Sequence, residues 1–570
     1  MHLILLMLRP ALIFLFVVIC MSGCNREAAP PKHQDTAAGL TSPASKSSHE
    51  KLVATHYFGR QWAKNFINAF RRDEVPGDFR RIREDGFNAV VLVISWGDFQ
   101  PVFQPCCRYD ARAFERLRFL LREAKNAGLK VILRVGYSLS FHPDAGSSQW
   151  RIQRLMNDPS VRAAYFAFGD SIAAEIADHE QVVMSFGSWE DLFLYHIEVS
   201  ATTDYAEFLS TLPPIDPLLA VQKSLEQNGQ RFPVNEGASK ELFQRYWDWL
   251  LIEKFFKPMQ ARLPNYSFEV RVDKEPLPVA GGATRWLGHE RTFVLPNAPA
   301  LTIYWAPFWG ARNEGERLRA SESTALLTHL LESLNKFSDV PLFLDQFNFL
   351  DNTPGFERNA TIRTEELPAF LEQAACVLRN KHVRGYALWT GRDYRESPLF
   401  NPAFVYGMDG WILIPAKGSH SALETLPAGD FQLRLAAGDT LSQAITDIRG
   451  RLLHADQRRD QVCVEAVAAQ TSQLDVQLGD KAPITRLAFD ANPNPNTVCA
   501  DLTPVMDAGK QVLRLHLQKG SLALRDVQVF DHVQSGGVYD EQGKALALRG
   551  SVRAMNRVFL AKPAPARCKL

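Results

Sequence analysis

The chain has 570 residues, of which 46% are hydrophobic and 11% aromatic, so it can bury a large core and is long enough for two or three domains. Its 64 basic and 63 acidic residues give a formal net charge of +1, which excludes a strong electrostatic attraction to a polyanion. We therefore expect a globular protein without a nucleic-acid partner.

The first residues, MHLILLMLRPALIFLFVVICMSGC, form an apolar run followed by small residues and a cysteine. This composition is typical of an export signal, which takes no part in the fold. The ending MSGC resembles a bacterial lipobox, which implies a lipoprotein signal peptide over 1–24 with Cys24 as the lipidation site. The alternative is an uncleaved signal anchor.

Lipidation of Cys24 implies a mature chain that is anchored to a membrane without spanning it. Asn25 follows the cysteine, and in lipoproteins this favours the outer membrane of a diderm bacterium, so we expect a location in the cell envelope. Residues 25–51 are rich in Ala, Pro, Ser and Thr, and this composition predicts a flexible tether.

Six cysteines remain after the signal and the lipidation site: Cys106, Cys107, Cys376, Cys463, Cys499 and Cys568. An exported chain can oxidise them, and Cys463 with Cys499 is a plausible disulfide, although sequence alone fixes no pairing. The adjacent Cys106 and Cys107 lack CxxC spacing and a histidine cluster. We therefore expect no metal site and no cofactor.

Between residues 65 and 394, eight short apolar runs alternate with longer segments, many of which have helical periodicity, such as 111–128, 321–337 and 365–380. The runs are NFINAF (65–70), NAVVLVISW (88–96), KVILRVGY (130–137), QVVMSFGSWE (181–190), SFEVRV (267–272), LTIYWAP (301–307), PLFLDQFNF (341–349) and RGYALWT (384–390). Strands buried on both faces and alternating with helices predict a parallel sheet, and eight units predict an α/β fold of the (β/α)8 TIM-barrel type over 52–414. An open doubly wound sheet is the alternative, but no Gly-rich phosphate loop follows any run.

Two stretches depart from this alternation. The span from about Glu198 to Glu241 interrupts it with loop-like sequence and is expected to shape a cleft. After Trp411 the runs are short, spaced by turn residues and free of helical segments, which predicts a C-terminal all-β domain, a jelly-roll-like sandwich, over 415–570.

Aromatic and polar residues gather at the predicted strand ends, where barrel active sites form. Flat aromatic faces beside hydrogen-bonding groups suit sugar rings, although any one of these aromatics can equally be packing. The residues expected at the site are Asn68, Trp96, Asp98, His142, Glu190, Tyr304, Trp305, Asp345, Gln346, Asn348, Trp389 and Asp393.

The motifs SWGDFQP, SWED, YWAP and GYALWT occur in order along the predicted strands. Together they resemble the clan A glycoside hydrolases, cellulase-like barrels of the glycoside hydrolase family 5 type. The resemblance implies that Glu190 is the general acid/base, that Tyr304 hydrogen-bonds the nucleophile and that Trp389 forms an aromatic floor under the sugar. Trp189 stands where the family has asparagine.

The seventh run departs from the family at the nucleophile, because Gln346 stands where the family has glutamate. An amide cannot attack an anomeric carbon, and Asp345 is the nearest carboxylate. Strand alternation sends neighbouring side chains to opposite faces, so Asp345 reaches the cleft only if a bulge re-aims it. Glu357 and Glu269 are further carboxylates that could substitute.

The sequence thus predicts a glycoside hydrolase that cleaves the O-glycosidic bonds of a polysaccharide, such as a β-glucan, a mannan or a bacterial exopolysaccharide, with Glu190 and Asp345 as the two carboxylates. Retaining and inverting chemistry both stay open. The alternative is a catalytically inactive barrel that binds glycans or supports exopolysaccharide assembly, since barrels host many functions.

Overall fold

The structure is a computed structural model, and its described residues all belong to one unit, His49–Leu570. The described ranges are 50–104, 107–137, 139–187, 201–270, 277–278, 284–285, 291–307, 315–336, 338–350, 358–381, 383–445, 461–479, 484–502, 511–530 and 532–568. The predicted signal peptide with Cys24 and nearly all of the predicted tether lie outside them. Within these ranges, every helix is too short or too polar to cross a membrane.

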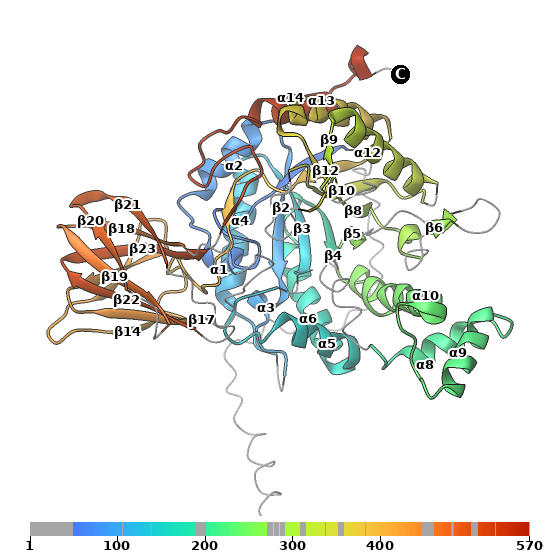
Figure 1. The fold of residues 1–570 in the computed structure, drawn as a ribbon, viewed down its shortest axis with the longest axis horizontal. Helices are drawn as coiled ribbons and strands as arrows, with labels where there is room; N and C mark the ends of the chain where they lie inside the picture. Colours follow the sequence, from blue (N-terminus) through green and yellow to red (C-terminus); the bar gives the residue numbers. More distant parts are fainter. Residues whose placement is uncertain are drawn as a thin grey trace, which may run out of the picture. The chain divides into compact units, whose positions relative to one another are not determined.

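Eight parallel strands close into a barrel in the order β1-β12-β10-β8-β5-β4-β3-β2. Figure 1 shows β2, β3 and β4 of this barrel near the centre of the view. Their bounds are β1 (Leu52–His56), β2 (Ala89–Ser95), β3 (Lys130–Tyr137), β4 (Val182–Gly187), β5 (Tyr266–Val270), β8 (Leu301–Trp305), β10 (Leu342–Phe347) and β12 (Gly385–Leu388). The predicted (β/α)8 barrel is confirmed.

Seven of the eight predicted runs contain a barrel strand, but the first was wrong. Residues 65–70 include the short helix α1 (Phe66–Ala69), and the first strand is LVATH, Leu52–His56. Both segments are short and completely buried, and periodicity cannot distinguish a buried strand from a buried helical turn over so few residues.

Alternation along the strands divides their side chains between two layers. One set forms a small apolar cluster inside the barrel: Leu52, Ala54, Ala89, Val91, Ile132, Met184, Phe186, Phe343 and Ala387. The other set packs outward against the helices in a much larger cluster. The bottom of the barrel is therefore filled with side chains, and polar groups are left for the carboxyl ends of the strands.

The helices pack their apolar faces on the barrel. Asp110 begins α4 by accepting a hydrogen bond from the Arg112 backbone N–H at 3.0 Å, and Leu117, Leu121 and Ala124 lie on its buried face. The described helices from α2 onward are α2 (Val75–Glu84), α3 (Trp96–Phe99), α4 (Ala111–Asn126), α5 (Ser148–Asn157), α6 (Pro159–Ile176), α8 (Tyr205–Thr211), α9 (Pro217–Gln227), α10 (Lys240–Leu250), α11 (Lys257–Gln260), α12 (Ala320–Asn335), α13 (Leu367–Asn380) and α14 (Arg549–Leu560). The span expected to be loop-like after the fourth strand contains α8 and α9, because Asp216 and Pro217 give α9 a well-capped start.

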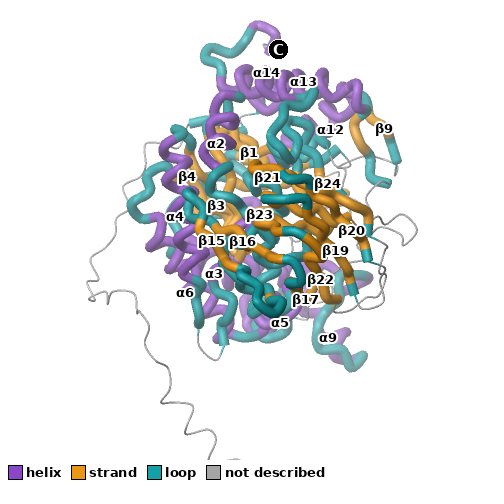
Figure 2. The backbone as a smooth tube through the Cα atoms, turned by 90° about the vertical axis from the view of Figure 1, so that its left-hand side faces the viewer, coloured by secondary structure: helices purple, strands orange, loops and turns teal. Residues whose placement is uncertain are grey.

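The β domain consists of two five-stranded antiparallel sheets, in the orders β14-β17-β22-β19-β20 and β15-β16-β23-β18-β21. Their bounds are β14 (Ile412–Ile414), β15 (Ala422–Thr425), β16 (Phe431–Ala436), β17 (Thr440–Ile445), β18 (Gln461–Ala468), β19 (Ser472–Leu478), β20 (Thr485–Phe489), β21 (Asn492–Asp501), β22 (Gln511–Lys519) and β23 (Ser521–Phe530). Alternate residues such as Leu433, Val464 and Leu515 form its core. Among the described residues from β14 to β23 there is no helix, so the predicted all-β domain is confirmed. Figure 2 shows many of these strands grouped together.

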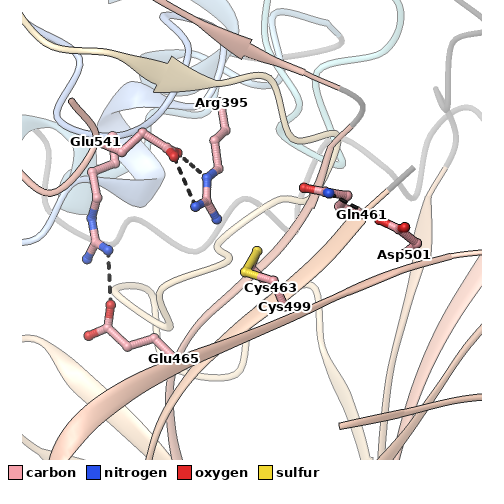
Figure 3. Close-up of a disulfide and its surroundings, with 8 residues drawn as sticks. Arg395, Gln461, Cys463, Glu465, Cys499, Asp501 and Glu541 are labelled. Atoms are coloured by element: carbon pink, nitrogen blue, oxygen red, sulfur yellow. Dashed lines mark hydrogen bonds and ion pairs between the residues drawn. A yellow bond between two sulfur atoms is a disulfide. The ribbon is translucent and has the colours of Figure 1, made fainter. Parts of the chain in front are cut away.

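A disulfide joins Cys463 on β18 to Cys499 on β21, the pair singled out from the sequence (Figure 3). The two residues face each other in the antiparallel register, with their Cα atoms 4.1 Å apart. Gln461, two residues along β18, hydrogen-bonds Asp501 at 3.1 Å. The disulfide therefore fastens the edge strand β21 to its neighbour.

The chain returns to the barrel after β23. The short strand β24 (Val533–Gln534) pairs with β13 (Tyr394–Arg395), and α14 packs beside α13, as Figure 1 shows. A second disulfide, Cys376–Cys568, ties the end of the chain to α13. The span 415–570, expected to be β throughout, therefore ends with a helical segment that covers the barrel.

Candidate active site at the mouth of the barrel

An ion pair lies at the centre of the barrel's carboxyl-terminal mouth. Arg134 on β3 and Glu269 on β5 are both 0% exposed, and Nη2 of the arginine lies 3.0 Å from Oε1 of the glutamate. Arg134 alternates with Ile132 of the inner cluster, so its side chain points into the barrel. Burying a charge is costly unless it is paired and hydrogen-bonded, so each of these groups depends on the other.

Gln346 joins this pair from the seventh barrel strand. Its Nε2 donates to Oε1 of Glu269 at 2.9 Å, and the side chain is buried. The Gln346 amide is therefore held by a carboxylate two strands away. The three residues form a network that we call the mouth triad: Arg134, Glu269 and Gln346.

A bulge interrupts β10 at Asp345. The pairing of β10 with β8 runs from Leu344 opposite Ile303 to Gln346 opposite Tyr304, and Asp345 has no partner in the register. Two residues on one strand thus occupy the space of one on the other, which is the definition of a bulge. The bulge that a catalytic role for Asp345 requires is present.

The bulge allows two successive side chains to point to the inner side of the barrel. Phe343 belongs to the inner cluster and Leu344 to the outer one, so ordinary alternation returns Asp345 to the inner side. Gln346 is also on the inner side, because it hydrogen-bonds Glu269. The Asp345 carboxyl group is completely buried there, next to the mouth triad.

His56 and Trp389 lie beside Arg134. The Trp389 ring is 4.8 Å from the His56 ring and 5.8 Å from the Arg134 guanidinium, measured to the tryptophan centroid. Its Nε1 donates to the hydroxyl of Tyr394 at 3.0 Å, which fixes the plane of the indole. Trp389 is only partly buried, so its ring is accessible at the mouth.

His56 stays neutral over the physiological pH range. Burial is the main cause, followed by the charge of Arg134, and together they lower the pKa of His56 to about 3. Its Nδ1 lies 3.2 Å from the carbonyl oxygen of Leu388, and within the described part of the chain its Nε2 has no partner. With the proton on Nδ1, the Nε2 lone pair is left to accept a hydrogen bond.

Tyr304 and Asn348 occupy the adjacent strand ends. Nδ2 of Asn348 donates to the Tyr304 hydroxyl at 3.5 Å, and its backbone N–H donates to the Trp305 carbonyl at 2.9 Å. Oδ1 of Asn348 is buried and has no partner among the described residues. The pair therefore offers hydrogen-bonding groups at the edge of the mouth.

Two predicted aromatic residues lie in the outer packing layer instead. Trp96 stacks on Phe103 with ring centroids 5.3 Å apart, and the Arg151 guanidinium lies 3.9 Å from the Trp96 ring. Trp305 stacks on Phe370 of α13 and is 0% exposed. Neither ring is at the mouth, because Trp96 belongs to α3 and Trp305 alternates with the inward-facing Tyr304 on β8.

Three predicted polar residues hold loops together. Oδ1 of Asn68 accepts from the Asn401 backbone N–H at 3.3 Å. Asp98 accepts from the Ser140 hydroxyl at 2.6 Å, and burial raises the pKa of Asp98 to about 6. Asp393 accepts from the Ser535 hydroxyl at 2.8 Å, and burial likewise raises its pKa to about 6.

The structure thus brings Tyr304, Asp345, Gln346, Asn348 and Trp389 together, and it places His142 in the loop after β3. Glu190, the predicted acid, and Glu357 lie outside the described residues. Among the residues that are described, no group of three His, Cys, Asp or Glu side chains could hold a metal ion.

Arg134 and His56 were not predicted as site residues from the sequence, and Glu269 was predicted only as a substitute carboxylate. The signal for Arg134 and Glu269 was a charged residue within a largely apolar run, KVILRVGY for the arginine and SFEVRV for the glutamate. Such a charge needs a buried partner, and two of them on strands of one barrel predict each other. His56 was missed because the first strand was assigned to the wrong segment.

No family model matches the chain, and no curated protein matches it. Solved structures similar to it include the exo-β-1,4-mannosidase Op5Man5 from Opitutaceae bacterium strain TAV5, at 17% identity and a TM-score of 0.40, over 62% of this chain and 56% of that one. GH5_18 from Streptomyces cattleya matches at 16% identity and a TM-score of 0.39, over 60% of this chain and 71% of that one. The endo-1,4-β-mannanase from Rhizomucor miehei matches at 10% identity and a TM-score of 0.36, over 60% of this chain and 86% of that one.

The match thus spans little more than half the length of the mannosidase. At these identities and TM-scores the strand pairing defines the barrel, and the function has to be argued from the side chains at its mouth.

Proposed function

We propose that the chain is a glycoside hydrolase that cleaves O-glycosidic bonds of a polysaccharide, with Glu190 as general acid and Asp345 as the second carboxylate. The observation that carries the proposal is the bulge in β10, which brings the Asp345 carboxyl group to the inner side of the barrel beside the mouth triad. Catalytic residues of barrel enzymes come from strand ends on this face.

The mouth triad explains how the site works without a glutamate at Gln346. The amide cannot act as a nucleophile, and its N–H is committed to Glu269. Glu269 in turn is neutralised by Arg134, so the floor of the mouth is fixed and carries no excess charge. This leaves Asp345 as the anionic group next to the reacting carbon.

An inverting reaction fits an aspartate best. Retention needs the two carboxyl groups about 5 Å apart, whereas inversion needs about 6.5–9.5 Å to admit a water molecule. Aspartate is one methylene shorter than glutamate, which widens the gap. Glu190 would protonate the glycosidic oxygen as the bond to the anomeric carbon breaks, and a water molecule would attack that carbon while giving its proton to Asp345.

The remaining mouth residues suit a sugar ring. The accessible indole of Trp389 offers a flat face for stacking, and its plane is fixed by Tyr394. Neutral His56 can accept from a sugar hydroxyl, and Asn348 with Tyr304 can do so on the other side of the mouth. Polar groups that point in different directions suit the several hydroxyls of a pyranose.

One observation favours the alternative, a barrel that binds glycans without cleaving them. Gln346, which stands where the resemblance places the nucleophile, hydrogen-bonds Glu269 in a buried network, and this supports a mouth without a nucleophile at that position. If Asp345 does not act as a base, the same mouth still binds sugar.

The test is release of reducing sugar by the full-length chain in detergent, with β-glucan, mannan and bacterial exopolysaccharide as substrates. We expect Glu190→Gln and Asp345→Asn each to lower kcat/KM by at least about 1,000-fold. Asp475→Asn, which changes a buried carboxylate of the β domain, is the matched control and should be fully active. The anomer of the first product, read by NMR, distinguishes inversion from retention.

A wild-type chain that binds one of these glycans but releases no sugar would establish the alternative. Loss of activity in Glu269→Gln together with full activity in Asp345→Asn would show that Glu269, and not Asp345, is the second catalytic carboxylate.

We also propose that the enzyme acts at the cell envelope through a lipid on Cys24. The support is the MSGC ending of the apolar N-terminal run. Cys24→Ser should shift the chain from the membrane fraction to the soluble fraction, and an unchanged distribution would exclude the anchor.

A further inference from the structure

A groove of about 790 Å³ opens away from the mouth triad, and no residue of that triad lines it. Its walls come from the segments that follow β1, β3 and β12 on the barrel and from β17 of the β domain. The three barrel segments leave the carboxyl ends of their strands, so the groove lies on the same face as the mouth. Its volume is within the range of about 300–1,000 Å³ that is usual for ligand sites.

The barrel wall of the groove is held rigidly. Ser140 donates to the buried Asp98 at 2.6 Å, and its hydroxyl oxygen accepts from the His142 backbone N–H at 3.0 Å. The Ser140 side chain packs closely against the backbone of Gly97, where an added Cβ would lie 2.9 Å from the Ser140 Cβ. This wall is therefore formed before any ligand arrives.

The opposite wall is fixed by Gln443 on β17. Its Oε1 accepts from the Phe400 backbone N–H and its Nε2 donates to the Phe400 carbonyl, both at 2.9 Å. The Phe400 ring in turn lies 5.1 Å from the His142 ring of the barrel wall. The β domain is thus locked to the barrel along the groove, and both contribute to one surface.

The lining of the groove combines apolar faces with hydrogen-bonding groups. Phe141 and the 63% exposed Ile412 supply apolar surface, and Ser148 and Gln149 supply polar atoms. The Lys64 ammonium lies 3.8 Å from the centroid of the Phe141 ring. Among the described residues that line the groove, none is a carboxylate, so no lining side chain repels an acidic sugar.

We propose that this groove binds a stretch of polysaccharide chain and holds the polymer beside the mouth. The inference rests on the glycan substrate proposed above, but it does not depend on cleavage. Sugar rings present C–H faces to apolar side chains and hydroxyls to amides and hydroxyl groups, which is the mixture found here. A chain anchored in the groove has a higher effective concentration at the mouth, so long polymers bind more tightly than short ones.

The test fills the groove. Ala444 on β17 is exposed and lines the groove, so Ala444→Trp blocks it without disturbing the core. Ala488 on β20 is an exposed alanine of the same sheet that lies outside the groove, and Ala488→Trp is the matched control. Affinity electrophoresis of the full-length chain through gels containing glucomannan, as a neutral polymer, or alginate, as an acidic one, measures binding without cleavage.

We expect at least one polymer to retard the wild type, Ala444→Trp to weaken this retardation at least fivefold, and Ala488→Trp to behave as the wild type. A wild type that neither polymer retards, or equal retardation of wild type and Ala444→Trp, would overturn the proposal. If the wild type cleaves no polymer but is retarded, and Ala444→Trp is not retarded, the groove proposal holds and the proposed hydrolase activity is wrong.

A second pair of variants, with a smaller expected effect, tests the same groove by removing apolar surface. Ile412 and Ile484 are 63% and 60% exposed, and only Ile412 lines the groove. Ile412→Ser should weaken retardation about twofold and Ile484→Ser should not, since a single exposed aliphatic side chain supplies only a small part of the apolar contact.

Discussion

Two buried arginine–carboxylate pairs serve different ends in this molecule. Arg134–Glu269 lies at the mouth of the barrel, and Arg116–Asp430 lies where α4 meets the β domain, with Nη1 and Oδ1 3.2 Å apart. All four residues are at most 1% exposed. By burial and charge alone the two pairs are nearly identical.

Their remaining partners differ. Arg116 gives its Nε to the carbonyl of Ile67 at 2.6 Å and an Nη to the carbonyl of Phe70, so it clamps the backbone around α1. Glu269 shares its Oε1 between Arg134 and the side chain of Gln346. A guanidinium bound to backbone carbonyls holds segments together, whereas one bound to a side-chain network at the mouth fixes the geometry of a site.

The largest effect is expected from breaking the junction pair. Asp430→Ala leaves the Arg116 charge buried without its carboxylate, which costs about 3–5 kcal/mol of unfolding free energy. Guanidinium denaturation followed by tryptophan fluorescence measures it. Asp409→Ala removes an exposed carboxylate paired with Arg112 and should cost less than about 1 kcal/mol. Equal shifts for both variants would contradict this reading of the junction.

Asp98 shows what burial does to a carboxylate that no arginine hydrogen-bonds within the described structure. Burial is the main cause that raises its pKa from 3.8 to about 6, whereas the Ser140 hydrogen bond, His142 and Arg151 lower the pKa and Asp110 raises it. Because the folded state holds this proton more tightly, its stabilising contribution is complete below pH 3.8 and is lost as the pH rises through about 6.

The loss amounts to about 3 kcal/mol over that interval. Asp98→Asn should therefore unfold with nearly the same free energy as the wild type at pH 4 and be more stable than it at pH 7. Denaturant unfolding at a series of pH values measures the difference. A difference between the two chains that does not change with pH would show that folding leaves the pKa of Asp98 unchanged.

The smallest of the expected effects comes from Glu269→Gln, an isosteric change in the Arg134–Glu269 pair of the mouth triad. It keeps the shape but removes the charge that balances Arg134 and orients Gln346, so kcat/KM should fall about 100-fold, or about 2.7 kcal/mol. Glu465→Gln, which loses the carboxylate paired with Arg60 at 3.0 Å, is the control and should retain activity.

A positioning role also makes a prediction about pH. The residual activity of Glu269→Gln should keep the pH profile of the wild type, because Glu190 and Asp345 still set it. A lost or displaced limb of that profile would instead make Glu269 a titrating catalytic group.

The sequence predicted much of the architecture because its pattern is local. Seven of eight strands and the all-β domain follow from the period of apolar residues and from turn composition, as does the disulfide candidate from two nearby β runs. The error at 65–70 arose where a buried segment is too short to show a period. Trp96 and Trp305 were misplaced because a strand end alone does not tell which of two faces a side chain takes.

The sequence by itself determined that a barrel would present polar and aromatic residues at its strand ends, because apolar periodicity and composition require no distant contact. Only the tertiary structure decided which of them meet. The bulge at Asp345, the bond between Gln346 and Glu269 across 77 positions, and the groove shared by Lys64 and Ala444 depend on strand register and domain packing. These are set by the closure of the whole chain, because a shift of one residue in the pairing of a strand turns its side chains to the opposite face.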